Sequence, residues 1–296
     1  MRLSIFRSAL RSQHPPFRLG RTSSPVAVFL LAVTCVLANP LKIVDAHVHQ
    51  IEGGPPVPAG VTFVPAETVY VSFQVEGYRV SPDSKVHLTY KIETFDPKGI
   101  KIVEPVESSV DEALAPEDKN WKPKVRQSMA IPPIAPPGNY RVSIRVTDDL
   151  DHDSATQDTT FAVSGVEIPA SPTLNVANFG FFRGEEDPEP LKIAAYRPGA
   201  ALWAKFNIVG YKFGEGNSIE VSYGVAVLSS SGKTLYSQPQ AAIEKSFSFY
   251  PKPYVPGSMN LSLQSNMRPG EYAILLTVHD AIGRQNYETK QVFRVE

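Results

Sequence analysis

The sequence contains one pattern twice. An offset of 133 residues places Phe73, Gly77, Tyr78, Tyr90 and Gly99 on Phe206, Gly210, Tyr211, Tyr223 and Gly232. Further along, an offset of 132 places Pro137, Gly138, Tyr140, Val146, Asp148, Phe161 and Val163 on Pro269, Gly270, Tyr272, Val278, Asp280, Phe293 and Val295. A single deletion reconciles the two offsets. Because a unit of about 130 residues can bury its own core, the repeat predicts two similar domains in tandem.

The first 38 residues differ in kind from the repeat. They hold five arginines and no acidic residue, and an apolar run over 26–38 is too short to span a bilayer well. Small residues at Val36 and Ala38 suit cleavage after Ala38. We therefore expect a signal peptide over residues 1–38 and an exported mature chain, periplasmic or extracellular, that has no transmembrane span.

Cysteine and charge restrict the chemistry of the mature chain. The single cysteine, Cys35, lies within the expected signal peptide, so the mature domains form no disulfide. Whether Cys35 is lipidated is left open, although residues 32–34 match a lipobox poorly. Loss of residues 1–38 leaves 24 basic and 30 acidic residues, a net charge of −6. This dispersed acidic charge argues against nucleic acid as a partner.

Apolar residues alternate with period two, which is typical of half-buried β-strands. The matching apolar sets are Val69, Val71, Phe73, Val75 with Leu202, Ala204, Phe206, Ile208; Val86, Leu88, Tyr90, Ile92 with Ile219, Val221, Tyr223, Val225; and Tyr140, Val142, Ile144, Val146 with Tyr272, Ile274, Leu276, Val278. Each copy therefore predicts the same set of strands, packed as a sandwich.

The tyrosines Tyr140 and Tyr272 each follow a Pro-Gly corner. This arrangement resembles the penultimate strand of fibronectin type III and bacterial Ig-like domains. The resemblance implies an all-β fold of two Ig-like antiparallel sandwiches, over residues 39–163 and 174–296, joined by a linker over 164–173. It implies an architecture and no particular function.

One segment carries a helical pattern. Ser109 and Glu112 have the spacing of a capping box, and Pro116 would end the helix. We expect a helix of at most two turns over 109–115.

The segment Asp45-Ala46-His47-Val48-His49 resembles the metal-binding strand of amidohydrolases. That family sets its ligands on a β/α barrel, and no alternation of helices and strands follows here. The second copy has Gly180 and Phe182 at the positions of His47 and His49. We therefore expect no metal and no cofactor, and keep a small metal-dependent hydrolase using Asp45, His47 and His49 as an alternative.

Two further motifs weaken when the copies are compared. Asp149, Asp151 and Asp153 alternate as in a calcium loop, so calcium binding remains an alternative. The segment lacks the glycine and the final acid of such a loop, so an ordinary hairpin is favoured. In the matching hairpin only Asp148 recurs, as Asp280, and we expect this aspartate to bind turn amides. Residues 230–234 mimic a phosphate loop, but we expect them to join two strands.

Four aromatic residues of the second copy have no counterparts in the first, namely Phe247, Phe249, Tyr250 and Tyr254. Phe247 and Phe249 share parity and could be buried, whereas Tyr250 and Tyr254 flank prolines and are expected to expose their rings partly. Exposed aromatics stack on sugars or dock proteins. These four residues are the candidate binding site.

These observations favour a non-enzymatic binding or structural module of the cell envelope or extracellular space. The expected partner is an envelope or extracellular protein, and a glycan bound by the aromatic residues is the alternative. The sequence identifies neither the ligand nor the oligomeric state.

Overall fold

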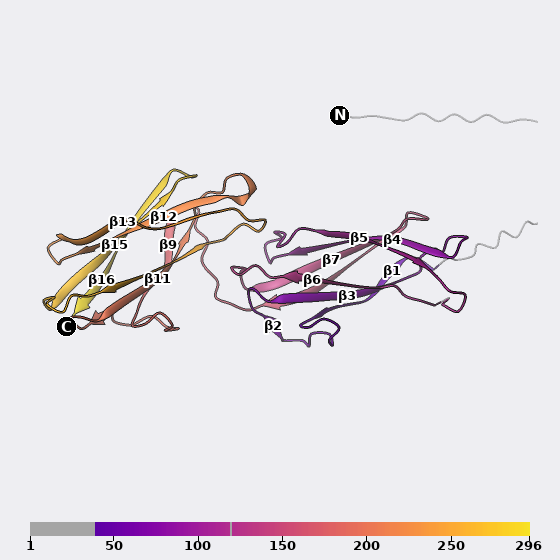
Figure 1. Ribbon diagram of the computed structural model, residues 1–296, viewed down its shortest axis with the longest axis horizontal. Helices are drawn as coiled ribbons and strands as arrows, with labels where there is room; N and C mark the ends of the chain where they lie inside the picture. Colours follow the sequence, from indigo (N-terminus) through magenta and orange to yellow (C-terminus); the bar gives the residue numbers. More distant parts are fainter. Residues whose placement is uncertain (1–38, 119) are drawn as a thin grey trace, which may run out of the picture. The chain divides into compact units, whose positions relative to one another are not determined.

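The computed structural model describes residues 39–118 and 120–296, and the expected signal peptide with Cys35 lies outside them. Figure 1 shows a chain built of strands. In the first copy they are β1 (Lys42–His49), β2 (Thr62–Phe63), β3 (Thr68–Glu76), β4 (Lys85–Phe95), β5 (Val106–Ala113), β6 (Lys124–Ala130), β7 (Gly138–Asp148) and β8 (Ser154–Val163). In the second they are β9 (Asn175–Phe182), β10 (Ala195–Tyr196), β11 (Ala201–Val209), β12 (Ile219–Leu228), β13 (Thr234–Ser246), β14 (Val255–Ser262), β15 (Gly270–Asp280) and β16 (Gln285–Val295).

Each copy folds into one three-stranded and one five-stranded sheet. The first has the orders β1-β3-β6 and β2-β8-β7-β4-β5, and the second has β9-β11-β14 and β10-β16-β15-β12-β13. The pairs are antiparallel except for β2 with β8 and β10 with β16, which are parallel. This is the strand arrangement of fibronectin type III and Ig-like sandwiches, so the predicted fold class is confirmed.

The expected inward faces form the two cores. Every residue of the sets on β3, β4, β7 and β11 is buried, and on β12 and β15 only Tyr223 and Tyr272 are partly exposed. The buried residues form two main clusters, one in each copy. Period-two alternation was therefore sufficient to assign the faces of the main strands.

The repeat also fixes backbone details. Gly77 and Gly210 both have positive φ, 79° and 74°, at the end of β3 and β11. A Cβ atom would meet the carbonyl oxygen of Pro40 in the first copy and of Thr173 in the second. Only glycine combines that conformation with that close approach, which explains its recurrence at this place.

The tyrosine that follows the Pro-Gly corner closes each sandwich. The Tyr140 hydroxyl donates to the carbonyl oxygen of Pro136 at 2.7 Å, and Tyr272 donates to Arg268 at 2.9 Å. Both bonds reach four residues upstream, as in the tyrosine corner of Ig-like domains. Tyr140 is fully buried and stacks on Phe161. Burial raises the pKa of its phenol, so the hydroxyl stays a donor at neutral pH.

Tyr140→Phe is expected to lower the free energy of unfolding of the first sandwich by about 1 kcal/mol, because it removes one hydrogen bond and keeps the ring. Urea denaturation followed by tryptophan fluorescence measures the change. Tyr272→Phe at the more exposed corner is the matched control, with a smaller expected loss. Equal losses would mean that burial does not set the strength of the corner.

The helix expected over 109–115 is wrong, because these residues belong mostly to β5, the edge strand beside β4. The Ser109 hydroxyl does not cap a helix but donates to Asp111 Oδ2 at 2.6 Å. Pairing with β4 over eight positions outweighs a local capping signal worth about 1 kcal/mol. Among the described residues the helical element is η1 (Glu215–Asn217), a single 3-10 turn.

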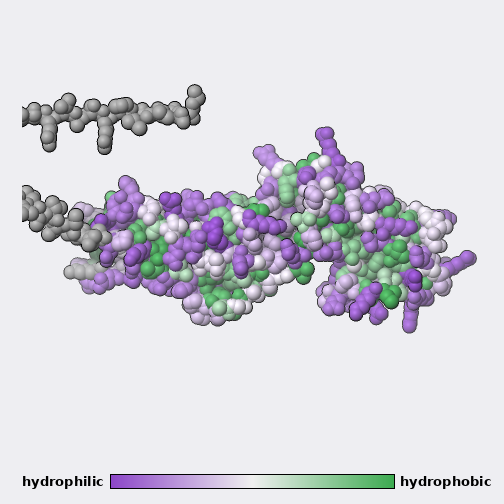
Figure 2. Space-filling model, turned by 180° about the vertical axis from the view of Figure 1, so that it is seen from behind, coloured by the Kyte–Doolittle hydropathy of each residue, from purple (hydrophilic) through white to green (hydrophobic). Residues whose placement is uncertain are grey.

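Figure 2 shows one face, on which hydrophobic residues form separate small areas among hydrophilic ones. Within residues 39–118 and 120–296 there is no helix with the length and apolarity needed to cross a bilayer.

Candidate functional site

The histidine segment lies on β1 and is interrupted by a bulge. The pairing of β1 with β3 shifts between Val44 and His47, and Asp45 has φ 52°. In the second copy β9 carries the same shift, and Asn178 has the same φ. Asp and Asn tolerate this left-handed conformation better than most residues. The recurrence explains Asp45 as a backbone residue of the bulge.

Asp45, His47 and His49 do not assemble as metal ligands. Their strand leaves Asp45 and His47 exposed and His49 buried, with the two imidazole centroids 6.4 Å apart. No group of three or more His, Cys, Asp or Glu side chains in the described part of the chain is arranged to hold a metal ion. Asp45, His47 and His49 therefore do not form the kind of ligand cluster that a metal-dependent hydrolase uses.

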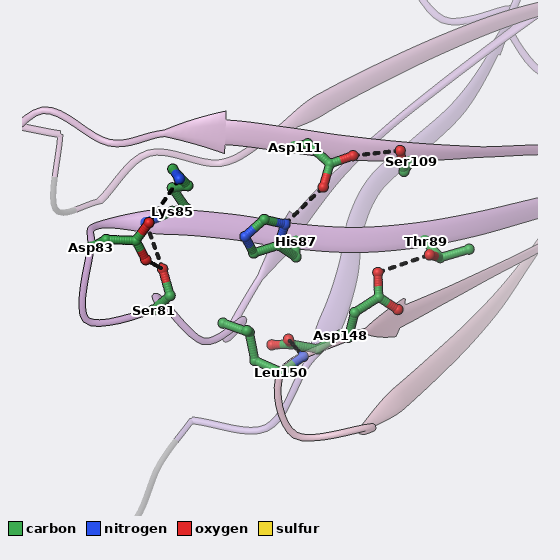
Figure 3. A network of polar contacts seen from close by, with 10 residues as sticks. Ser81, Asp83, Lys85, His87, Thr89, Ser109, Asp111, Asp148 and Leu150 are labelled. Atoms are coloured by element: carbon green, nitrogen blue, oxygen red, sulfur yellow. Dashed lines mark hydrogen bonds and ion pairs between the residues drawn. The ribbon is translucent and has the colours of Figure 1, made fainter.

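The acidic residues Asp149, Asp151 and Asp153, in the hairpin between β7 and β8, do not form a common site either. Asp149 accepts the Thr89 hydroxyl at 2.8 Å, and Asp151 pairs with Arg79 at 2.8 Å. The Arg79 guanidinium lowers the pKa of Asp151. Figure 3 shows this region, in which Asp148 lies close to Leu150 and His87 of β4 faces Asp111 of β5. The Asp149 and Asp151 carboxylates thus have separate protein partners, and Asp153 binds Asp151 through its backbone N–H group, so the three acids do not converge as in a calcium loop.

The aspartate shared by both copies binds turn amides, as the repeat predicted. Asp148 accepts the backbone N–H groups of Arg79 at 2.6 Å and Leu150 at 3.0 Å. Asp280 accepts those of Lys212 at 2.9 Å and Gly283 at 3.0 Å. The phosphate-loop mimic is likewise a turn between β12 and β13, as predicted.

The four aromatic candidates do not share one exposed surface. The exposed fraction is 83% for Phe247 and 45% for Phe249, and Tyr254 is partly exposed. Tyr250 is only 7% exposed and belongs to the core cluster of the first copy. The expected exposure was wrong for Tyr250, and the suggested burial was wrong for Phe247 and Phe249. Proline spacing could not show that Tyr250 has a partner distant in sequence.

A hollow of about 150 Å³ lies on the outer face of β1, β3 and β6. His49, Ser72 and Arg126 line it from the three strands, because alternation turns them away from the core residues Val48, Val71 and Val125. Lys124, two residues before Arg126 on β6, and the turn residues Glu52, Gly53 and Gly54 complete its main walls. Of these lining residues, only His49 was a candidate site residue from the sequence.

His49 lines this hollow and is only 7% exposed. Its Nε2 lies 2.8 Å from Ser72 Oγ. Its Nδ1 has no hydrogen-bond partner, and it is the single buried side-chain nitrogen or oxygen of residues 39–118 and 120–296 that lacks one. An unpartnered buried polar atom costs about 1–3 kcal/mol, so protein cores rarely keep one without a reason.

Two cations lie at the rim of the hollow. Ser72 pairs in register with Arg126, and Lys124 projects from the same face of β6. Both side chains are exposed, and neither forms an ion pair within the described residues. The acidic side chain among the lining residues is Glu52, which is exposed.

The second copy fills the equivalent place with its own side chains. Pairing with β11 puts Phe182 where the first copy has His49, and Lys205 where it has Ser72. The Lys205 ammonium lies 4.7 Å from the centroid of the Phe182 ring and donates to the carbonyl oxygens of Glu185 and Asp187. The cation is thus satisfied internally. The open, unpartnered version of this place belongs to the first copy.

The fold defines a tandem β-sandwich protein of fibronectin type III-like topology. No protein-family model matches the chain, and no curated protein is detectably similar in sequence. Among solved structures, the C-terminal domain of the Streptococcus pyogenes antigen I/II-family protein AspA aligns with 87% of this chain and 100% of its own, at 9% identity and a TM-score of 0.31.

The Streptococcus agalactiae antigen I/II polypeptide BspA C-terminal domain aligns with 87% of this chain and 100% of its own, at 10% identity and a TM-score of 0.28. The Pseudomonas fluorescens alkylpurine DNA glycosylase AlkC aligns with 42% of this chain and 30% of its own, at 14% identity and a TM-score of 0.28. Scores this low transfer no function, so the function is proposed from the chain's own residues.

Proposed function

We propose that this protein is an exported, non-enzymatic binding module whose ligand site is the hollow around His49. The observation that carries the proposal is the difference between the copies. The two sandwiches have the same topology and the same bulge, but they differ at the place that Phe182 and Lys205 fill in the second. The first copy has a hollow at this place, lined by His49, whose buried Nδ1 has no hydrogen-bond partner among the described residues.

Binding is favoured over catalysis by the surroundings of the His49–Ser72 pair. A serine nucleophile needs a histidine base that a third group orients. Here the His49 Nδ1 atom has no acidic partner among the described residues, and Ser72 lies within a regular strand, paired with His47 and Arg126. The pair therefore suits recognition of a ligand better than acyl transfer.

The double variant His49→Phe with Arg126→Ser tests the proposal by giving the first copy the second copy's residues at these two positions, while Ser72 is kept. Ser258 is the equivalent of Arg126, because it pairs with Lys205 as Arg126 pairs with Ser72. Retention of soluble envelope components on the immobilised protein is expected to fall at least tenfold, because the variant removes the imidazole and the guanidinium that line the hollow.

The control is Phe247→Ser, which changes an exposed aromatic side chain of the second copy. Its retention should match that of the unmodified protein, and circular dichroism checks that both variants are folded. If Phe247→Ser loses retention and the double variant keeps it, the aromatic segment is the binding surface and the proposal fails.

A further inference from the structure

The hollow offers more donors than acceptors. Arg126 contributes a planar guanidinium, Lys124 an ammonium and Ser72 a hydroxyl, against the carboxylate of Glu52. A guanidinium binds the two oxygens of an oxyanion in parallel, and its charge strengthens both hydrogen bonds. Two cations and one acid leave a local charge of +1, which matches a monoanion better than a dianion.

The size of the hollow limits which part of a ligand enters it. About 150 Å³ is the space of a few water molecules, since each takes about 30 Å³ in the liquid. A carboxylate with its neighbouring atoms fits this space, and the rest of a larger ligand would remain outside. Glu52, at the wall formed by the turn after β1, can accept a hydrogen bond from an adjacent hydroxyl.

His49 is consistent with the same ligand. When the Ser72 hydroxyl donates a hydrogen bond to Nε2, the neutral imidazole carries its own proton on Nδ1. Nδ1 is then a buried donor that lacks an acceptor. An anionic oxygen is the strongest acceptor for such a group.

We infer that the hollow around His49 binds a carboxylate group, held by Arg126 and Lys124 and oriented by His49 and Ser72. The inference rests on the proposed function, because it names the ligand class of the same site. Its nearest carriers are hydroxy acids, in which a hydroxyl one or two carbons away from the carboxylate carbon reaches Glu52. Both an acidic sugar and a small free acid present this chemistry.

The test is a titration of the ¹⁵N-labelled protein with matched probes, followed by amide chemical shifts. D-glucuronate and glycolate represent the acidic sugar and the free acid, D-glucose is the neutral match of the sugar, and inorganic phosphate represents a dianion. We expect D-glucuronate or glycolate to shift the amides of Ser72, Gly53 and Arg126 with a dissociation constant of about 1 mM, the range of a few charged hydrogen bonds.

Arg126→Gln should weaken this binding at least tenfold, because it removes the bidentate cation and leaves the fold intact. Arg145→Gln, an exposed arginine on β7 of the other sheet, makes the same charge change and should leave binding unchanged. Equal weakening in the two variants would show that only overall charge matters, and would overturn the inference.

Other outcomes separate this inference from the proposed function. If D-glucose gives the same shifts as D-glucuronate, or phosphate binds more tightly than both acids, the ligand is not a carboxylate. Suppose that no probe shifts these amides but the double variant His49→Phe with Arg126→Ser loses envelope retention. The hollow is then a binding site, and the carboxylate inference fails. If the double variant keeps both the amide shifts and the envelope retention of the unmodified protein, the carboxylate inference and the proposed function both fail.

Discussion

Asp280→Ala is expected to lower the free energy of unfolding of the second sandwich by about 2–4 kcal/mol, and Asp148→Ala to do the same in the first. The Asp280 carboxylate is fully buried and accepts the backbone N–H groups of Lys212 and Gly283, together with the Gln285 side chain at 3.1 Å. Alanine leaves the N–H groups of Lys212 and Gly283 without their acceptor, at up to about 1–3 kcal/mol each. Urea denaturation followed by circular dichroism measures both losses.

Asp158→Ala is the control for this prediction. Asp158 is an exposed residue of β8 that pairs with Arg141 at 3.2 Å, so its loss should cost less than about 1 kcal/mol. Asp280→Asn keeps one acceptor oxygen and should fall between the unmodified protein and the alanine variant. If Asp280→Ala is as stable as Asp158→Ala, the buried carboxylate does not hold the two strand ends together.

The shared aspartate illustrates how much of the fold the sequence predicts. A residue that recurs in both copies has a role that does not depend on either copy's ligand, so Asp148 and Asp280 were assigned correctly to turn chemistry. The same comparison assigned the inward faces of the main strands and the tyrosine corners. Period two and turn residues are local signals, and in this fold the local pattern agrees with the tertiary packing.

The predictions that failed depend on contacts distant in sequence. Residues 109–115 have a capping box, but pairing with β4 decides their structure. The hollow combines His49 with Ser72 and Arg126, which are 23 and 77 residues away along the chain. Only the register of three strands brings them together, so the sequence identified a histidine pair and missed the cations that give the site its charge.

Tyr250 is the clearest case of such a contact. Its segment is attached to the second copy, because Asn217 donates to the carbonyl oxygen of Phe249 at 2.7 Å and Tyr211 donates to that of Lys252 at 2.6 Å. Its own ring lies in the core cluster of the first copy, where the hydroxyl donates to Asp96 Oδ2 at 2.9 Å. Burial, and then the charge of Asp96, raise the pKa of this phenol.

Asp96 is itself buried and accepts three hydrogen bonds. It is 4% exposed, and its Oδ1 accepts the backbone N–H groups of Lys98 and Ile100, both at 2.8 Å. The Tyr250 hydroxyl therefore satisfies the second oxygen of a buried carboxylate that already holds a turn of the first copy. The unshared aromatic segment thus connects the two copies through Tyr250.

Tyr250→Ala is expected to lower the free energy of unfolding by about 3–5 kcal/mol, the usual cost of deleting a buried aromatic ring, and also to leave one Asp96 oxygen unpartnered. Differential scanning calorimetry should show the first sandwich melting at a lower temperature, separately from the second, because the side chain that couples them is gone. Tyr250→Phe keeps the ring and should lose only the part of the stability that is due to the hydroxyl.

The control is Phe247→Ala, at an exposed residue of the same segment, which should change the free energy of unfolding by less than about 0.5 kcal/mol. Equal melting of Tyr250→Ala and Phe247→Ala would mean that the contact with Asp96 contributes nothing to stability, and that the two copies fold independently of it.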